Sequence, residues 1–383
     1  MNDNKLQSRR DILSALIFLL LVLGLFLANF IYKTPEISQT ERRPLAEFPS
    51  IFVEKAGKSS LNSDFSDEFE TWSADSFLAR DSFRSLKGIA VFHVFSQMDN
   101  NGIFLVDGSV GKMETLNEAS FQKSTEKIAA LADRLPASAN VWYSIIPDKG
   151  YYLSQARKGI IPTIDYTAGA EILKSTLGEA GYIDLLPALS ADSYYRTDLH
   201  WRQEALGGVL SALSKAMGLE NRLDQDFGNI PMDTPFYGAY YGQAAVPMQS
   251  DTLYFLISPS TDSALVKAIN TETLQMEPME MYQIEKYTGI DPYDIYLGGA
   301  QPLITIENPN AATSRQLFLF RDSFGSSLAP LLAGAYAKIT LIDLRYISAT
   351  LLPQLVEFPE DCDVLFLYSA QVLNNSDILL VNF

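Results

Sequence analysis

The most pronounced hydrophobic pattern in the chain is an uninterrupted apolar run near its N-terminus, Ile12 to Tyr32, which contains no charged residue. At about 1.5 Å per residue, a helix of this length crosses a hydrocarbon core of about 30 Å. Arg9 and Arg10 precede the run, so the positive-inside rule places that end in the cytoplasm. A cleaved signal peptide is the alternative, but its apolar core is usually shorter and ends in small residues. We therefore predict a single-pass transmembrane anchor, residues 12–32, after a cytoplasmic tail, residues 1–11.

The segment that follows the anchor is polar and contains three prolines, Pro35, Pro44 and Pro49, which predicts an extended tether over residues 33–64. From Phe65 to Gly88, apolar residues recur three and four positions apart with charges between them, the pattern of an amphipathic helix, in which we also consider a break near Ser73. We place the start of an extracytoplasmic domain here and assign residues 65–383 to it.

Later in the chain, amphipathic helical segments alternate with short apolar runs typical of buried strands, the pattern of βαβ units. We therefore expect an α/β fold with a parallel sheet flanked by helices. The expected helices are Phe121–Leu135, Ala168–Ala180 and Ser326–Tyr336, and the expected strands are Asn140–Pro147, Tyr182–Leu186, Gln316–Phe320, Ala337–Leu344 and Val364–Tyr368. A stretch at about 222–310, rich in Tyr, Pro, Gly and Met, is predicted to be an inserted region of strands and long loops.

Composition narrows the classes of partner. The formal net charge of −17 argues against a nucleic-acid partner, because the basic stripe that neutralises phosphates is missing. The single cysteine, Cys362, lies in an apolar stretch and is expected to be a small buried residue. The sequence contains no phosphate loop, dinucleotide-binding glycine motif or Cys/His metal cluster, so we expect neither a cofactor nor a metal.

Two short motifs contain the residue types of a serine nucleophile and its base. Asp198 and His200 are two residues apart, so in an extended segment both face one way and the carboxylate can orient the imidazole. Ser323 directly follows a predicted strand and precedes a predicted helix, at the carboxyl edge of the sheet, where such folds bind ligands. A serine hydroxyl needs a base to activate it, and the base needs an acid to orient it. Ser323, His200 and Asp198 supply these roles, so the sequence predicts a hydrolytic triad.

Each motif also has a purely structural interpretation. An Asp-x-His triplet is common by chance, and Asp-Ser-Phe-Gly after a strand is frequently a turn that caps a helix. We interpret Asp322 as such a cap. The chain has only two histidines, however, and one of them is in this motif.

The sequence Thr197-Asp-Leu-His-Trp201, with Phe320-Arg-Asp-Ser-Phe-Gly325 later in the chain, resembles the DHHW protein family. It is also similar to the alginate O-acetylation proteins, whose soluble domains are SGNH-hydrolase-like. The resemblance implies that fold, with Ser323 as nucleophile, His200 as base and Asp198 as orienting acid. Two positions depart from the pattern: Leu199 replaces the second histidine of the family name, and Arg321 replaces the glycine of the alginate-type proteins. Further segments of similarity are Ser38–Pro49, Pro147-Asp-Lys149 and Ala337–Tyr346.

Other residues are weaker candidates for the site. The backbone of Ser323, with Gly299 and Gln301, is a candidate oxyanion hole, although Gly299 and Gln301 also fit a plain glycine turn. Tyr237, Tyr240 and Tyr241 are candidates for stacking on a sugar, and equally for packing on the core.

Together these features predict a membrane-anchored, extracytoplasmic O-acetyltransferase acting on a cell-surface polysaccharide. Because the chain has one predicted span and no acyl-coenzyme site, the resemblance also implies a separate multi-pass membrane acyltransferase as acyl donor. A carbohydrate esterase with the same triad remains open. So does a non-catalytic glycan-binding or assembly scaffold.

Overall fold

The computed structural model describes residues 2–31, 35–55, 58–155, 160–178, 181–224 and 226–382. The chain forms two compact units, Met1–Phe95 with Ala245–Pro247, and Ser96–Ala244 with Met248–Phe383. The predicted domain start at residue 65 therefore lies inside the first unit.

Helix α1 (Asn2–Ile31) contains a stretch, Arg10–Ala28, that is long and apolar enough to cross a membrane. Length and composition alone support this, and a signal sequence near the N-terminus has the same properties. Tyr32, the last residue of the predicted span, lies outside the described residues.

The rest of the first unit contains two strand pairs and two helices. The pairs are β1 (Ile37–Ser38) with β2 (Arg43–Pro44) and β3 (Phe52–Lys55) with β4 (Lys58–Leu61), and the helices are α2 (Phe65–Asp75) and α3 (Arg80–Ile89), followed by the π-helical turn η1 (Ala90–Val94). The predicted helix thus breaks just after Asp75, a buried carboxylate that accepts two hydrogen bonds from the Arg43 guanidinium. This ion pair joins α2 to the segment before it, which explains why α2 groups with the first unit.

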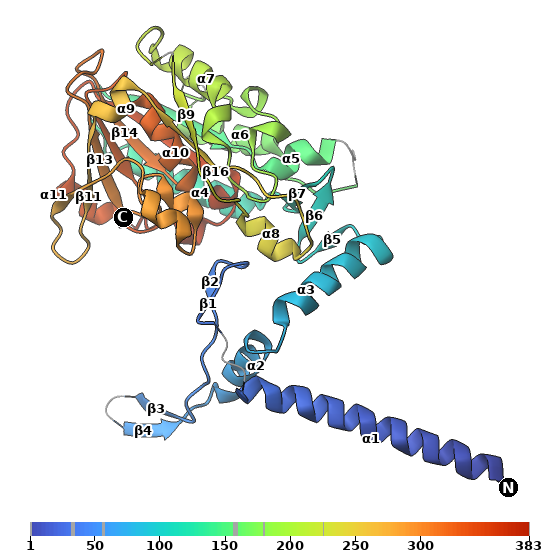
Figure 1. The fold of residues 1–383 in the computed structure, drawn as a ribbon. Coiled ribbons are helices and arrows are strands. Elements are labelled where there is room, and N and C mark those ends of the chain that lie inside the picture. The colour runs from blue at the N-terminus through green and yellow to red at the C-terminus, as the bar shows by residue number, and fades with distance from the viewer. Residues whose placement is uncertain are drawn as a thin grey trace. The chain divides into compact units, whose positions relative to one another are not determined.

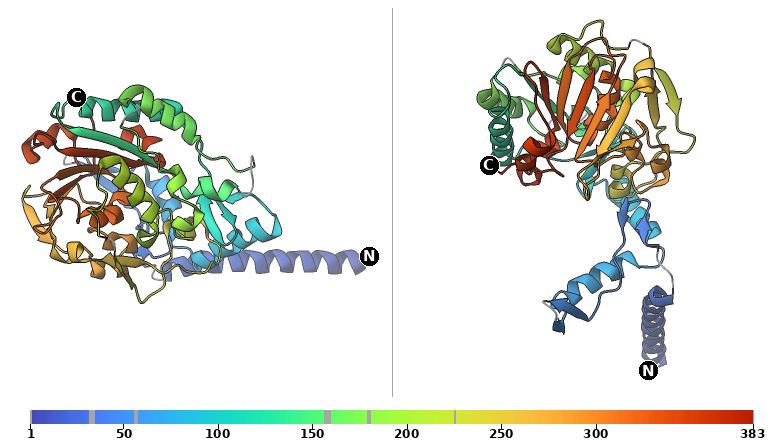
Figure 2. Two further views of the ribbon diagram at one scale, coloured as in Figure 1. Left: turned by 90° about the horizontal axis from the view of Figure 1, so that it is seen from above. Right: turned by 90° about the vertical axis from the view of Figure 1, so that its left-hand side faces the viewer.

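A seven-stranded sheet forms the centre of the second unit (Figures 1 and 2). Its spatial order is β12 (Met276–Met279), β11 (Leu265–Ile269), β13 (Leu303–Glu307), β15 (Lys338–Ile342), β14 (Gln316–Arg321), β16 (Asp363–Ser369) and β8 (Asn140–Ile146). The last four strands in this order are parallel to one another, as predicted. The predicted strand Tyr182–Leu186 is reduced to an isolated bridge between Tyr182 and Tyr143.

The predicted insertion is not peripheral to this sheet. Its strands β11, β12 and β13 extend the sheet by antiparallel pairing, with β13 against β15. The sheet is therefore mixed, with a parallel half and an antiparallel half. Residues 222–310 complete the central layer in addition to forming loops.

Helices cover both faces of the sheet, so its strands are apolar on both sides. In β14, Leu317 and Leu319 pack in one core cluster with residues of α7 (Gly207–Met217) and α10 (Ser323–Leu332). Phe318 and Phe320 face the other way, into a cluster with residues of α4 (Glu118–Ala132) and α6 (Tyr166–Leu177). Cys362 is buried in this second cluster, as expected.

Smaller elements surround the sheet. The strands are β5 (Asp99–Asn100), β6 (Ile103–Val106) and β7 (Ser109–Lys112), which form one sheet, and the pair β9 (Gly228–Pro231) and β10 (Tyr254–Ile257). The short α-helices are α5 (Lys149–Ser154), α8 (Ala239–Ala244), α9 (Pro259–Ser263), α11 (Leu352–Leu355) and α12 (Ala370–Leu373). The 3-10 helices are η3 (Leu186–Ala188), η4 (Ala191–Ser193), η5 (Gln203–Ala205), η6 (Ile284–Thr288), η7 (Pro292–Ile295), η8 (Ala349–Leu351) and η9 (Ser376–Ile378).

Candidate active site

Ser323 is the first residue of α10, two residues after the end of β14. The helix begins three residues earlier than predicted because Asp322 caps it: one carboxylate oxygen accepts from the N–H of Phe324 at 3.1 Å. The other oxygen accepts from the N–H of Ser369 at 2.7 Å, which ties the turn to the end of β16. The cap interpretation of Asp322 is confirmed, and its rigid turn presents a partly exposed Ser323 at the carboxyl edge of the parallel strands.

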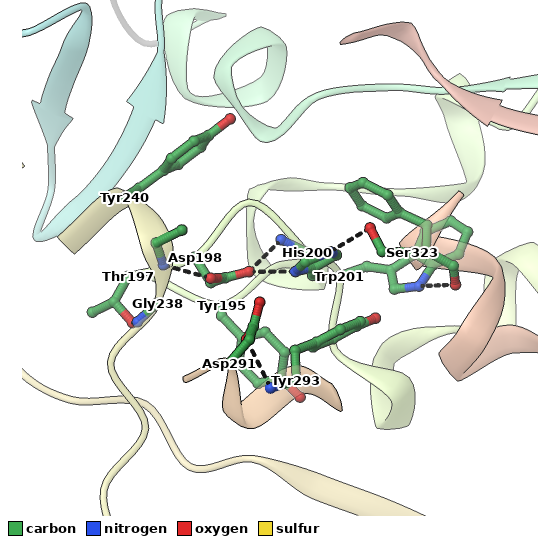
Figure 3. Close-up of polar contacts among 12 residues, drawn as sticks. Tyr195, Thr197, Asp198, His200, Trp201, Gly238, Tyr240, Asp291, Tyr293 and Ser323 are labelled. Carbon is green, nitrogen blue, oxygen red and sulfur yellow. Dashed lines mark hydrogen bonds and ion pairs between the residues drawn. The ribbon is translucent and has the colours of Figure 1, made fainter. Parts of the chain in front are cut away.

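Asp198, His200 and Ser323 form a continuous chain of close polar contacts (Figure 3). Oδ1 of Asp198 lies 2.6 Å from Nδ1 of His200, and Nε2 of His200 lies 2.8 Å from Oγ of Ser323. When Nδ1–H of a neutral imidazole donates a hydrogen bond to Asp198, Nε2 carries no proton. Nε2 can then accept a hydrogen bond from the serine hydroxyl. Both Asp198 and His200 are buried.

The turn before α8 holds the second carboxylate oxygen of Asp198. Oδ2 accepts from the N–H of Ala239 at 2.7 Å, and the N–H of Gly238 donates to Oγ1 of Thr197 at 2.9 Å. Gly238 packs so tightly that a Cβ atom there would lie 2.1 Å from the Cβ of Asp198. The carboxylate is therefore fixed in position as well as paired with the imidazole.

Two charged residues, the buried Lys149 and the partly exposed Asp251, support the loop that carries Asp198. Asp251 accepts from the N–H groups of Arg196 and Thr197, both at 2.9 Å, and from the Thr197 hydroxyl at 2.6 Å. Lys149 donates from Nζ to the carbonyls of Tyr195, Arg196 and Asp198 at 2.7–3.1 Å. Burial lowers the pKa of Lys149 to about 8, against the opposing effect of nearby carboxylates.

An aromatic ring packs directly on the imidazole. Tyr293, on η7, stacks on His200 with ring centroids 3.8 Å apart and planes inclined by 7°. Neither Tyr293 nor Asp251 was identified from the sequence, because neither lies in a motif or near one along the chain. No local signal was available to find them.

The three oxyanion-hole candidates differ in whether their backbone N–H groups already donate a hydrogen bond. The N–H of Ser323, at the first turn of α10, has no acceptor among the described residues. The N–H groups of Gly299 and Gln301 instead donate within their own turn, to the carbonyls of Tyr296 and Gly299. Gly299 has a φ of +78°, so these two residues form the plain glycine turn that was the alternative.

The three aromatic candidates are also separated by the structure. Tyr237 is 41% exposed and its ring lies 4.6 Å from that of Tyr241. Tyr240 is 2% exposed, and its hydroxyl donates to Asp148 and accepts from Gln371. Of the two interpretations of Tyr240, packing on the core is the one that its burial and hydrogen bonds fit.

Within the described residues, no group of three or more His, Cys, Asp and Glu side chains is arranged to hold a metal ion. Asp198, His200 and Ser323 instead form hydrogen-bonded contacts with one another.

Comparison with known proteins tests the resemblance that the sequence predicts. The model of the DHHW protein family matches residues 175–342, a stretch that contains Asp198, His200 and Ser323. The predicted resemblance to the DHHW family is confirmed. No curated protein sequence matches the chain.

Two solved structures share the fold of this chain at low sequence identity. A DHHW family protein from Eubacterium siraeum is 18% identical with a TM-score of 0.57, and the match covers 74% of this chain and 95% of that chain. PatB1 from Bacillus cereus, with a sulfonyl adduct, is 18% identical with a TM-score of 0.58 over 73% of this chain and 98% of that chain. The O-acetyltransferase domain of Pseudomonas putida AlgJ is 14% identical with a TM-score of 0.43 over 71% and 92%. The first two matches confirm the predicted α/β fold.

Proposed function

We propose that the chain is an extracytoplasmic, serine-dependent O-acetyltransferase in which Ser323 is the nucleophile, His200 its base and Asp198 the acid that orients the base. The observation that carries the proposal is the unbroken contact chain from Asp198 through both imidazole nitrogens to the Ser323 hydroxyl. A serine hydroxyl is a weak nucleophile, and this arrangement supplies the base that activates it.

The reaction has two halves. In the first, Nε2 of His200 takes the hydroxyl proton while Oγ of Ser323 attacks the acyl carbonyl carbon. The tetrahedral adduct collapses, the leaving group departs with the proton from the imidazolium, and an acyl ester remains on Ser323. In the second, an acceptor hydroxyl gives its proton to His200 and attacks the ester, and the imidazolium returns the proton to Oγ.

The free N–H of Ser323 is suited to the negative charge on the adduct. It lies at the N-terminus of α10, a ten-residue helix whose dipole favours negative charge there. Because the N–H has no acceptor among the described residues, it can donate to an oxyanion without breaking an existing bond.

We propose a cell-surface polysaccharide as acceptor and a multi-pass membrane acyltransferase as donor. On this proposal α1 is a single-pass anchor with its N-terminus in the cytoplasm, and it keeps the second unit close to a donor delivered through the membrane. Tethering raises the effective concentration of such a donor. A site that positions the sugar hydroxyl then favours transfer over hydrolysis through proximity.

The test is to compare the O-acetyl content of surface polysaccharides in cells that carry the wild-type chain and in cells that carry Ser323→Ala. Ser326→Ala is a matched control, because this buried serine lies in the same helix and its hydroxyl has no hydrogen-bond partner among the described residues. We expect less acetylation with Ser323→Ala and unchanged acetylation with Ser326→Ala.

More acetylation in the Ser323→Ala cells would replace the transferase with an esterase that uses the same residues. Unchanged acetylation of every surface polymer would reject both roles and favour a non-catalytic, glycan-binding or scaffold protein.

A further inference from the structure

The imidazole of His200 is enclosed by two aromatic rings. Tyr293 stacks face to face on it, with ring centroids 3.8 Å apart, and Phe324 lies at 4.9 Å with its plane inclined by 55°. Each ring nitrogen of His200 makes one hydrogen bond, and both bonds lie near the plane of the ring. Such bonds only weakly restrain a tilt of the ring about the line from Nδ1 to Nε2. A parallel ring in contact with one face restricts that tilt.

Tyr293 is itself held firmly. Its side chain is 3% exposed, and its N–H donates to the carboxylate of Asp291 at 3.0 Å. Its hydroxyl donates to Oγ of Ser327 at 2.7 Å. The position of the ring is therefore set from both ends, by the backbone of η7 and by a contact with α10.

Ser327 connects three separate segments. Its Oγ accepts from the Tyr293 hydroxyl and from Nε1 of Trp201 at 2.8 Å, and donates to the carbonyl of Phe324 at 3.2 Å. Trp201 adjoins His200 in the chain, and Ser327 lies one turn after Ser323 on α10. Ser327 therefore connects the segments that carry Tyr293, His200 and Ser323.

We propose that Tyr293 is a positioning residue for His200: its ring fixes the imidazole plane so that Nε2 points at Ser323, and the hydrogen bond from its hydroxyl to Ser327 is a secondary support that the packed ring does not require. The inference rests on the proposed function of Ser323 and His200. The face of the phenol ring also attracts the positive imidazolium that forms during proton transfer.

Three variants of the full chain in detergent test the role. Tyr293→Leu removes the ring, whereas Tyr293→Phe keeps the ring and loses the hydroxyl. Tyr296→Leu is the control: Tyr296 is a fully buried tyrosine whose ring packs on Tyr293 with centroids 4.8 Å apart, but among the described residues it makes no ring contact or hydrogen bond with His200, so it separates loss of cluster packing from loss of the ring on the imidazole. For a small aryl acetate we expect Tyr293→Leu to lower kcat roughly 10- to 100-fold with little change in KM, since small misplacement of a reacting group has costs of this order. Tyr293→Phe and Tyr296→Leu should retain most of the wild-type kcat.

A second readout does not depend on turnover. The chain has two histidines, so a ¹³C-histidine-labelled His93→Gln background leaves His200 as the single imidazole signal. The stacked ring should shift the Hε1 resonance of His200 upfield, and this shift should be lost in Tyr293→Leu and kept in Tyr293→Phe and Tyr296→Leu.

The outcomes separate the two proposals. Wild-type kcat in Tyr293→Leu together with an inactive Ser323→Ala would overturn the role of Tyr293 alone, as would an unchanged Hε1 shift. Equal loss of kcat in Tyr293→Phe and Tyr293→Leu would also overturn it, because the ring would not be what acts. Turnover that persists in Ser323→Ala would instead reject the proposed function, whatever the Tyr293 variants do.

Discussion

Nε2 of His200 lies 2.8 Å from Oγ of Ser323, although 123 residues separate them in the chain. The contact joins a loop held by Lys149 and Asp251 to a helix capped by Asp322. Neither partner reaches the other through local structure. Trp201 packs on Phe324 and donates to Ser327, which brings the two segments together, so the geometry depends on residues that buttress each side.

Gly238 provides one test of this buttressing. A Cβ atom at this position would lie 2.1 Å from the Cβ of Asp198 and 2.4 Å from its Oδ2. Gly238→Ala must therefore displace the carboxylate, and we expect kcat for an aryl acetate to fall by roughly 10²-fold. Steady-state kinetics on the purified full chain measures this.

Gly207→Ala is the matched control, because a Cβ at Gly207 meets no atom within 4 Å. It should leave kcat unchanged and, within helix α7, raise stability by about 0.4–1 kcal/mol. Equal activities in the two variants would show that the Gly238 contact does not hold Asp198 in place.

Lys149 predicts a pH dependence of stability. Burial lowers its pKa from 10.5 in the unfolded chain to about 8 in the folded one. Between these values the unfolded chain binds more protons, so the free energy of unfolding rises with pH through this range. Lys149→Met lacks this contribution. The stability of the wild type relative to Lys149→Met should therefore increase from pH 8 to pH 10.5, by up to about 3 kcal/mol.

Urea denaturation of both proteins across this range measures the difference. The comparison with Lys149→Met cancels the titration of tyrosines and other groups that both chains share. A relative stability that falls as pH rises would mean that the three carbonyls around Nζ favour the ammonium form more than burial opposes it.

The elements predicted from the sequence are those whose pattern is local and strong. The apolar runs that became β8, β14, β15 and β16 are buried on both faces and bounded by polar residues, so pattern alone located them. Ser323 was identified because the sequence shows a strand ending just before it and a helix following it, although α10 begins at Ser323 itself and not at the predicted Ser326.

What the sequence did not reveal depends on pairing between distant segments. β13 joins the sheet through antiparallel pairing with β15, and nothing in residues 303–307 specifies that partner. His93 lies in an apolar run of the sequence, Ile89 to Phe95, which predicts a core histidine, yet its side chain is exposed in the first unit, so this prediction is wrong. Likewise, Tyr293 reaches His200 only because η7 packs beside the site, and Tyr240 is buried by contacts with Asp148 and Gln371.

The proposed topology is tested with intact cells or spheroplasts. If α1 is a retained anchor with its N-terminus in the cytoplasm, added protease should digest the chain after Thr34 and leave a short N-terminal tag protected. Protection of the whole chain until lysis would contradict this orientation. Recovery of a mature protein that begins after residue 32 would identify α1 as a cleaved signal.

The most direct test of the account is covalent labelling of Ser323. A sulfonyl fluoride is a suitable probe, because an activated serine hydroxyl attacks its sulfur and displaces fluoride. The detergent-solubilised full chain, treated with the reagent, is examined by intact mass and peptide mapping. We predict one added sulfonyl group on Ser323, absent in Ser323→Ala, strongly reduced in His200→Ala and unchanged in Ser326→Ala, with turnover of an aryl acetate following the same order. Labelling at the wild-type rate in His200→Ala, or full turnover in Ser323→Ala, would contradict the account.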